Sequence, residues 1–311
     1  MTFAVTLLAA SLLVFATLDL LPGNAAQVML GETATPEAVT ALAHRLGLDQ
    51  PAPQRYLRWL AGLATLELGD SIAYDTPIAG LVAERLAVTL PLALLAMALT
   101  TLIALAAGLY AAAHHRRLGD LLVMSVSQIG IAVPSFWSGI LLVLLFAVTL
   151  QWFPAGGFPG WTEDGGGGLW DGLHALLLPA VALALAQAAI LARITRSALL
   201  DVWREDFVRT ARAKGLSRRA VLWRHVLRNA LVPVVTVMGL QFANLVTGTI
   251  VIENVFALPG LGRLIFQAIS NRDLPLVRNI VMLLAASVIA INFAVDLLYA
   301  VIDPRLRAAP T

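Results

Sequence analysis

The chain has 311 residues, of which 59% are hydrophobic and only 13% are charged, and its net charge is +2. Soluble globular domains have about a quarter of their residues charged, so this composition excludes an ordinary soluble protein. The sequence contains no cysteine, which excludes disulfides and thiolate metal sites.

Six apolar runs predict an all-α, polytopic membrane protein. Four of them are uncharged and reach the roughly 20 residues of helix that cross a hydrocarbon core; they cover residues 88–113, 121–150, 173–192 and 229–252. Two further runs, residues 1–21 and 279–302, each carry one acid near an end, Asp19 and Asp296. We therefore expect six transmembrane helices.

The first run lacks the positively charged start and the small-residue cleavage site of a signal peptide, so we expect a retained helix. Residues 22–87 then form a predicted helical segment on the outer face. One short helix is expected after Thr35, with Pro36 in its first turn and Gly47 at its end, and PQRYLRWLAGLATL is expected to form a second. Such a segment is a place for a partner to dock; the alternative is a structureless loop.

Lysine and arginine are distributed unevenly between the two sides that six spans define. The side that holds both termini receives 14 of the 21 cations, and the opposite side receives 7. Cytoplasmic loops are enriched in Lys and Arg, so we expect both termini in the cytoplasm. This leaves residues 22–87 outside, a five-span core at residues 88–302 and a cytoplasmic tail at residues 303–311.

The densest group of cations lies in DFVRTARAKGLSRRAVLWRHVLRNALVP, residues 206–233. Its pattern predicts two short helices, in which Gly215 ends the first in the left-handed conformation and Ser217 caps the second. Residues at helical spacing form a predicted stripe on the first helix: Trp203, Phe207, Thr210, Ala211 and Lys214. On the second helix the shared face is predicted to hold Ala220, Trp223 and Leu227.

Three interpretations of this basic segment compete. An orientation signal with contact to anionic lipid would need only the charges. Nucleic-acid binding is disfavoured because a segment tied to the bilayer at both ends is a poor reader of a groove. A docking element for a cytoplasmic partner is favoured, because it explains an amphipathic helix pair that is interrupted by glycine and carries tryptophans.

TARAKGLSRRAV followed by RHVLRNALVPVVT resembles the EAA loop of bacterial ABC-transporter permeases, and more narrowly the B-type permease of dipeptide, oligopeptide and nickel importers. The resemblance covers almost the whole chain through these stretches, in order: LLPGNAA, LGLDQPAPQRYLRWL, LELGDSI, IAVPSFWSGILL, IENVFALPGLGRLIFQAISNRDLPLV and VDLLYAVIDPRLR. When the loop pattern is aligned on Gly215, Arg209, Thr210 and Ala211 occupy the Glu-Ala-Ala positions, and Arg228 replaces the later proline. The absent acid and proline fit the peptide and nickel branch.

The resemblance implies the fold of a type I ABC importer permease in the bacterial inner membrane, with coupling helices at about residues 199–228. It implies contact with an ATPase through residues of the basic segment: Arg209, Ala211, Lys214, Gly215 and Leu216. The implied partners are a second, C-type permease, two ATPase subunits or one heterodimer, an extracytoplasmic solute-binding protein and membrane lipid. Short peptides are the expected cargo, and nickel or a metal chelate is the alternative.

The residues themselves indicate where the energy comes from. The chain has no GxxxxGK[ST] phosphate loop, and its single lysine, Lys214, lies between Ala213 and Gly215. We therefore expect no cofactor in this chain, with ATP and Mg bound by partner subunits. No histidine spacing suggests a zinc or hydrolase site, so an enzyme is disfavoured. A self-sufficient secondary transporter would show inverted repeats with matched broken helices, and none is found.

Polar residues within the spans are costly unless they face protein or water. The candidates for a translocation pathway or a helix or subunit interface are Gln187, Gln241, Asn244, Glu253, Asn292 and Asp296. Glu253 lies near an outer end and suits a gate or an interface. The sequence does not distinguish a pathway lining from an interface.

Overall fold

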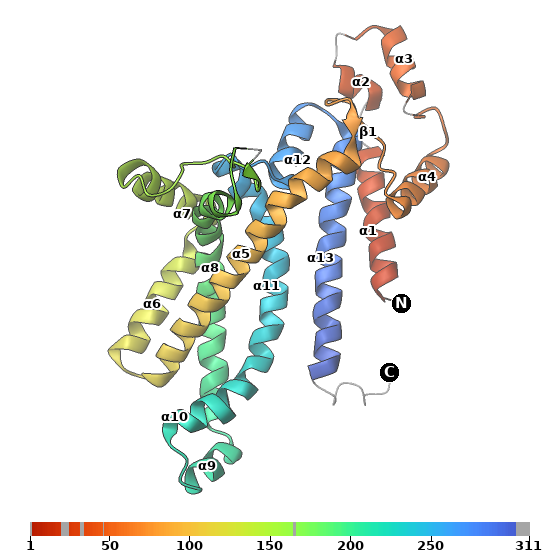
Figure 1. Cartoon of the computed structure of the whole chain (residues 1–311). Coiled ribbons are helices and arrows are strands. Elements are labelled where there is room, and N and C mark those ends of the chain that lie inside the picture. Colours follow the sequence, from red (N-terminus) through yellow and green to blue (C-terminus); the bar gives the residue numbers. More distant parts are fainter. Residues whose placement is uncertain (1, 20–24, 32–33, 46, 164–165, 303–311) are drawn as a thin grey trace. The chain divides into compact units, whose positions relative to one another are not determined.

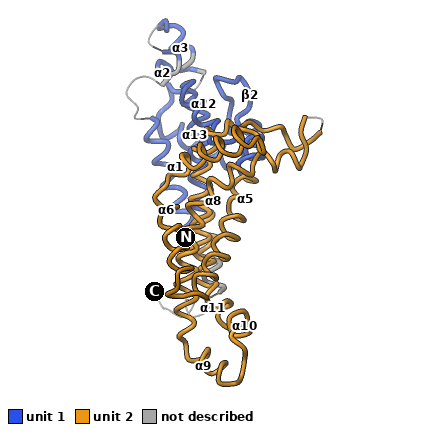
Figure 2. The backbone as a smooth tube through the Cα atoms, turned by 90° about the vertical axis from the view of Figure 1, so that its left-hand side faces the viewer, with its two compact units in different colours: residues 1–89, 259–290 blue, residues 90–258, 291–311 orange. Residues whose placement is uncertain are grey.

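The computed structural model describes residues 2–19, 25–31, 34–45, 47–163 and 166–302. Helices dominate these residues, and Figure 1 shows their order along the chain. The chain divides into two compact units, coloured in Figure 2, of which the first comprises residues 1–89 and 259–290 and the second residues 90–258 and 291–311. The helices α5 (Ile78–Ala113) and α13 (Leu274–Ile302) contribute residues to both units.

The first unit combines short helices and a small hairpin with parts of two long helices. It holds the helices α1 (Thr2–Asp19), α2 (Ala25–Leu30), α3 (Pro36–Arg45), α4 (Ala52–Thr65) and α12 (Leu261–Ser270), together with the first parts of α5 and α13. The strands β1 (Asp70–Ser71) and β2 (Thr76–Pro77) form a small antiparallel hairpin between α4 and α5. The two helices that the sequence predicts after Thr35 and in PQRYLRWLAGLATL are therefore confirmed as α3 and α4.

A small core and two buried polar groups hold the first unit together. Val14, Phe15, Trp59 and Met282 pack into one apolar cluster. Asn279 accepts a hydrogen bond from Trp59 Nε1 at 2.9 Å and donates one to the carbonyl oxygen of Leu68 at 3.0 Å, which connects α4 and the chain beyond it to α13. The carboxylate of Asp273 caps α13 and also anchors the hairpin loop, because it accepts from Leu276 N, Ala73 N and Ser71 Oγ.

The second unit is built around α8 (Leu169–Trp203), whose small residues permit close packing. Gly108 of α5 lies against the backbone oxygen of Ala192 and the side chain of Thr195, and Gly130 lies against Ala189. Close approach through small residues is typical of helix packing in membranes. The other elements of this unit are α6 (Leu118–Ala132), α7 (Ser135–Leu142), the π-helical turn η1 (Val143–Thr149), α9 (Asp206–Ala213), α10 (Arg218–Val221), the π-helical turn η3 (Leu222–Val226), α11 (Leu227–Val255) and the remaining parts of α5 and α13.

Among the described residues, four helices are long and apolar enough to cross a membrane: Ile78–Ala113, Leu169–Trp203, Arg218–Val255 and Leu274–Leu297. A fifth candidate is the pair α6 and α7 with η1, which bends by 102° at its break. The described part of the first predicted span, Phe3–Asp19, is a shorter apolar helix. The all-α membrane fold is thus confirmed, and these helices are compatible with six spans.

The third predicted span, residues 121–150, differs from the expectation of one continuous helix. Val133 has extended dihedral angles (φ −88°, ψ 121°) between α6 and α7. The residue before a proline is pushed out of the helical region by the proline ring, and Pro134 follows directly. Pro134 therefore accounts for the bend.

Candidate functional site

The basic segment folds as two short helices joined by a tight turn, as the sequence predicts. Gly215 follows α9 with φ +81°, a conformation that favours glycine. Ser217 Oγ accepts a hydrogen bond from Ala220 N at 3.3 Å and caps α10. The chain then continues through η3 into α11, so the helix pair is attached without a loop to a long apolar helix.

The buried face of this helix pair is formed by Val208, Ala211 and Val221, and Val226 of the following turn η3 continues it. They belong to one apolar cluster with residues of α8 and α11, such as Leu199 and Ala230. The pair is therefore packed onto the ends of two long helices. A displacement of the helix pair would therefore require α8 and α11 to move with it, or the apolar cluster between them to open.

The predicted stripe on the first helix does not coincide with the buried face of α9, and its first member, Trp203, is the last residue of α8. Ala211 is its only fully buried member and Trp203 is half-buried, whereas Thr210 and Lys214 are exposed and Phe207 is 42% exposed. The buried face of α9 is set by Val208 and Ala211, which are three positions apart. The stripe drawn from Phe207 is offset from it by one residue.

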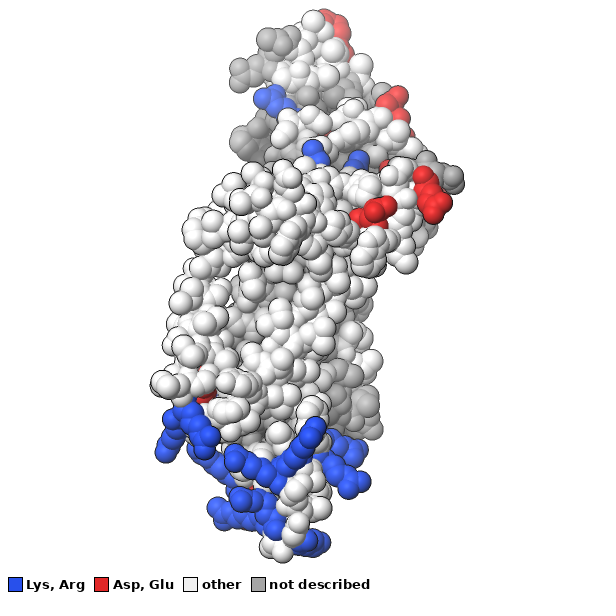
Figure 3. Space-filling view, turned by 60° about the vertical axis from the view of Figure 1, so that its left-hand side comes forward, with Lys and Arg blue, Asp and Glu red and all other residues white. Residues whose placement is uncertain are grey.

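The opposite face of the helix pair offers cations and aromatic rings to solvent. Arg209, Lys214 and Gly215 are exposed, as are Phe207 and, on the second helical segment, Trp223. Figure 3 shows that Lys and Arg side chains gather at the end of the second unit that carries α9 and α10. Arg209 pairs with Asp206 at 3.3 Å, but both side chains are largely exposed, so this pair contributes little to stability.

The five residues expected to contact an ATPase divide into two groups. Arg209, Lys214 and Gly215 lie on the exposed surface of the helix pair. Ala211 is 6% exposed and packs inward, and Leu216 is half-buried against the same apolar cluster. The first three are therefore available to a partner, whereas the other two hold the pair to the rest of the unit.

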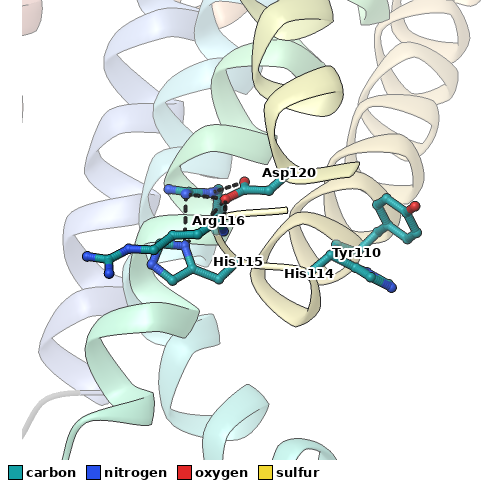
Figure 4. Close-up of polar contacts among 6 residues, drawn as sticks. Tyr110, His114, His115, Arg116 and Asp120 are labelled. Carbon is teal, nitrogen blue, oxygen red and sulfur yellow. Dashed lines mark hydrogen bonds and ion pairs between the residues drawn. The ribbon is translucent and has the colours of Figure 1, made fainter. Parts of the chain in front are cut away.

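An ion-pair cluster near the helix pair was not predicted (Figure 4). Asp120, at the start of α6, has a side chain that is 4% exposed and forms a two-pronged interaction with Arg196 of α8, at 2.5 Å to Nε and 2.7 Å to Nη2. His115 Nδ1 lies 3.1 Å from Arg196 Nη2, and the Arg116 backbone N–H donates to Asp120 Oδ2 at 3.0 Å. The cluster, which we call the Asp120–Arg196 clasp, fastens the α5–α6 turn to α8.

Two of the polar candidates within the spans meet. Gln241 Nε2 of α11 donates to the backbone oxygen of Gln187 of α8 at 3.0 Å. Both side-chain Oε1 atoms are buried and have no hydrogen-bond partner in the part of the chain that the structure describes. This contact joins two central helices of the second unit.

The other polar candidates lie in different surroundings. Glu253 is fully buried near the end of α11, Asn244 of α11 is exposed, and on α13 Asn292 is half-buried and Asp296 exposed. Among the described residues, no three His, Cys, Asp or Glu side chains are grouped so that they could hold a metal ion. The polar candidates therefore do not form one site.

Family models match nearly the whole chain. The model described as "Binding-protein-dependent transport system inner membrane component" matches residues 104–308. A model of the N-terminal part of the binding-protein-dependent transport system membrane component matches residues 1–93. The boundary between them falls within α5.

Curated relatives are similar to the chain over almost its full length. A Brucella abortus (strain 2308) protein that carries the name of a peptide transport system permease protein is 46% identical over 301 residues, covering 97% of this chain and 95% of its own. The di/tripeptide transport system permease protein DppB of Pseudomonas aeruginosa (strain UCBPP-PA14) is 41% identical with the same coverage. The glutathione transport system permease protein GsiC of Escherichia coli O6:H1 is 39% identical, again with the same coverage.

Solved structures share the fold at low sequence identity. An inward-facing structure of the MetNI methionine ABC transporter matches with a TM-score of 0.59 at 18% identity, and the match covers 72% of this chain and 96% of that chain. An amino acid ABC transporter solved with histidines matches with a TM-score of 0.52 at 18% identity, covering 71% and 94%.

Proposed function

The chain belongs to the family of binding-protein-dependent transport system inner membrane components, and on that premise we propose dipeptides or short oligopeptides as its cargo. It is a multi-pass permease subunit of an ABC transporter. The relatives above are named for peptide, di/tripeptide and glutathione transport, which supports peptides over the nickel alternative. Glutathione is itself a small peptide, so the names point to one class of cargo.

We further propose that α9 and α10 are the coupling helices that dock on a separate ATPase. The observation that carries this proposal is the division of the helix pair into a buried apolar face and an exposed face with cations and aromatic rings. A surface that only oriented the chain or contacted lipid would need cations but no packed, glycine-turned pair. Arg209, Lys214 and Gly215 are the proposed contacts, and Ala211 and Leu216 are proposed to support them from within.

The proposed assembly contains this chain, a second, C-type permease, two ATPase subunits or one heterodimer, and an extracytoplasmic solute-binding protein. ATP and Mg are assigned to the ATPase subunits, because this sequence has no phosphate-binding loop. Rigid helices that are packed onto α8 and α11 suit the transmission of a movement between an ATPase and the spans.

For the membrane topology we propose that both termini and α9–α10 lie in the cytoplasm and that residues 22–87 lie outside. The excess of Lys and Arg on the side of the helix pair supports this orientation. Residues 88–302 are then the five-span core, and residues 303–311, which lie outside the described residues, the cytoplasmic tail.

For the polar residues of the spans we propose three roles. Gln187 and Gln241 act as a helix–helix contact, since they hydrogen-bond across α8 and α11. Asn244, Asn292 and Asp296 are proposed to face the pathway or the second permease, because each retains exposed surface in this chain. Glu253 is proposed as a residue of the outer gate, where its burial favours a fixed position.

A glycine substitution tests the coupling proposal. At Gly215, φ is +81°, and beyond its two chain neighbours no described atom lies within 4 Å of the position of a Cβ, so the replacement Gly215→Val acts through backbone conformation rather than through a clash. Gly157 provides a matched control, because its φ is +83° and its Cβ position is equally open. ATP-dependent peptide uptake by the complete importer should be lost in Gly215→Val and retained in Gly157→Val, with equal membrane insertion. Wild-type uptake in Gly215→Val would contradict the coupling role.

A further inference from the structure

An arginine-rich pocket lies within the first unit, among α1, α4, the β1 hairpin and the start of α13. Its volume is about 470 Å³, within the range of about 300–1,000 Å³ that is typical of small-molecule sites. The charged side chains that line it come from four elements: Asp19, Arg55, Arg58, Asp70 and Arg278. The pocket thus holds one more arginine than carboxylate.

Within this pocket, Arg55 and Asp19 already satisfy each other. Arg55 Nη1 lies 2.7 Å from Asp19 Oδ1, and its Nη2 donates to Oδ2 at 3.1 Å, which makes a two-pronged ion pair. Arg55 Nε donates to the backbone oxygen of Gln50 at 3.1 Å. The Asp19 carboxylate is therefore engaged with Arg55.

Among the residues that the structure describes, neither Arg278 nor Arg58 forms an ion pair with a carboxylate, and Arg278 is the less exposed of the two. Its guanidinium lies 4.9 Å from the ring centroid of Trp59 and 5.9 Å from that of Phe15, and Arg55 lies 5.8 Å from the same Phe15 ring. Its Nε atom is buried and has no hydrogen-bond partner among the residues that the structure describes. Stacking on aromatic faces favours a cation, but a buried guanidinium nitrogen that makes no hydrogen bond is costly.

A second unsatisfied group lies in the same pocket. The Oε1 atom of Gln50 is buried and also lacks a partner within the described ranges. Arg278 and Gln50, which both line the pocket, therefore each leave one buried polar atom unpaired among the described residues. A carboxylate in the pocket would give the Arg278 guanidinium an anionic partner that it lacks among the described residues.

We propose that this pocket binds the carboxylate of a small ligand, with Arg278 as its principal partner and Arg58 as a second cation at the exposed rim. The carboxyl terminus of a short peptide is the natural ligand of this chemistry, a step that rests on the function proposed above. A guanidinium binds a carboxylate through paired hydrogen bonds in one plane, which lysine does not reproduce. The stacked rings of Trp59 and Phe15 hold the Arg278 guanidinium in place for such a contact.

Binding to the purified full chain tests the pocket separately from transport. The probes are N-acetyl-Ala-Ala, which has a free carboxylate, and its carboxamide, which differs only in that group. Isothermal titration in a phosphate-free detergent should show binding of the acid and none of the amide. Equal binding of both probes, or of neither, would overturn the proposal.

Substitutions of single arginines test whether Arg278 is the residue that binds the carboxylate of N-acetyl-Ala-Ala. Charge-assisted hydrogen bonds of this kind correspond to roughly a tenfold to hundredfold change in affinity, so Arg278→Gln should weaken binding of the acid by at least that tenfold. Arg85→Gln is the control, because Arg85 belongs to the same unit, also has a buried Nε with no described partner, and does not line the pocket. Should Arg278→Gln fail to fold, Arg58→Gln removes an exposed cation of the same pocket and should weaken binding severalfold.

Lipid phosphate is the competing source of an anion. Addition of phosphatidylglycerol to the micelles should leave binding of N-acetyl-Ala-Ala unchanged, whereas its displacement by that lipid would overturn the proposal. If the acid fails to bind while the complete importer still takes up peptide with ATP, the pocket is wrong and the proposed function stands. If the acid binds but no peptide is transported, the proposed function is wrong.

Discussion

At the scale of single residues, the Asp120–Arg196 clasp is a buried ion pair that is expected to contribute strongly to stability. Asp120 is nearly fully buried and receives hydrogen bonds from Arg196 and from the Arg116 backbone. Removal of one member of a buried ion pair leaves the other charge buried without a partner. This lowers the free energy of unfolding far more than loss of an exposed pair does. The clasp also lies on α8, the helix that leads into α9.

Arg196→Met should therefore lower the free energy of unfolding by about 3 kcal/mol. Arg209→Met removes an arginine from an exposed pair on the same unit and should cost less than about 0.5 kcal/mol. Denaturant unfolding of the two purified variants in the same detergent measures the difference. The double variant Asp120→Asn with Arg196→Met should recover part of the loss, and equal losses for the two single variants would contradict the clasp.

Local chemistry explains which residues could be predicted from the sequence. Gly215 and Ser217 act on their immediate neighbours through a left-handed turn and a cap, so their roles follow from the sequence around them. The pairing of Asp120 with Arg196 joins residues 76 positions apart. In the sequence, Asp120 precedes one apolar run and Arg196 follows a different one. No local pattern indicates that the two residues form a pair.

At the scale of elements, the buried face of α9 could not be predicted from its sequence, because the helix has few apolar residues. Val208 and Phe207 are neighbours with similar apolar character, yet Val208 is 1% exposed and Phe207 is 42% exposed. In a helix of eight residues there is too little repetition to fix the phase of the pattern. Contact with α8 and α11 decides which face is buried.

This assignment predicts different outcomes for two adjacent substitutions. Val208→Asp should release the helix pair from its apolar cluster, because a buried unpaired carboxylate costs several kcal/mol. Phe207→Asp should leave the fold intact, because that side chain already meets solvent. Limited trypsin digestion reports the difference, since the segment is rich in Arg: rapid cleavage is expected within α9–α10 of Val208→Asp only. Similar cleavage of both variants would mean that the assigned faces are wrong.

The bend between α6 and α7 was also not predicted from the sequence, although the apolar run that contains it was. An apolar run of this length predicts a span, and the run is indeed helical on both sides of Val133. Pro134 explains why the helix breaks, but the size of the bend, 102°, does not follow from the sequence pattern. Both α6 and α7 contact α8.

At the scale of the whole molecule, the predicted topology can be read directly because the chain has no cysteine. Leu57→Cys introduces a thiol on the exposed face of α4, and Lys214→Cys introduces one after α9. A membrane-impermeant maleimide should label Leu57→Cys in spheroplasts and Lys214→Cys only in inverted vesicles, with the ATPase subunits left out of the expression strain. Labelling of both from the same side would contradict the proposed orientation.

Composition and apolar run length were enough to predict an all-α membrane protein, and the resemblance of its motifs to known families implied a permease. These features are averages over long stretches of the chain, so they depend little on any single contact. The buried face of α9, the clasp and the arginine pocket depend on which distant residues meet, such as Asp19 with Arg55 or Gln241 with Gln187. Such contacts are determined by tertiary packing, so they could not be predicted from the sequence alone.

The central claim is that this permease moves peptide only when a separate ATPase acts on its α9–α10 helix pair. Uptake of a labelled dipeptide into proteoliposomes that contain both permeases and the solute-binding protein measures it directly. The expected result is ATP-dependent uptake when the ATPase subunits are present, and none when they are omitted. Concentrative uptake by the permeases without the ATPase subunits would contradict the claim.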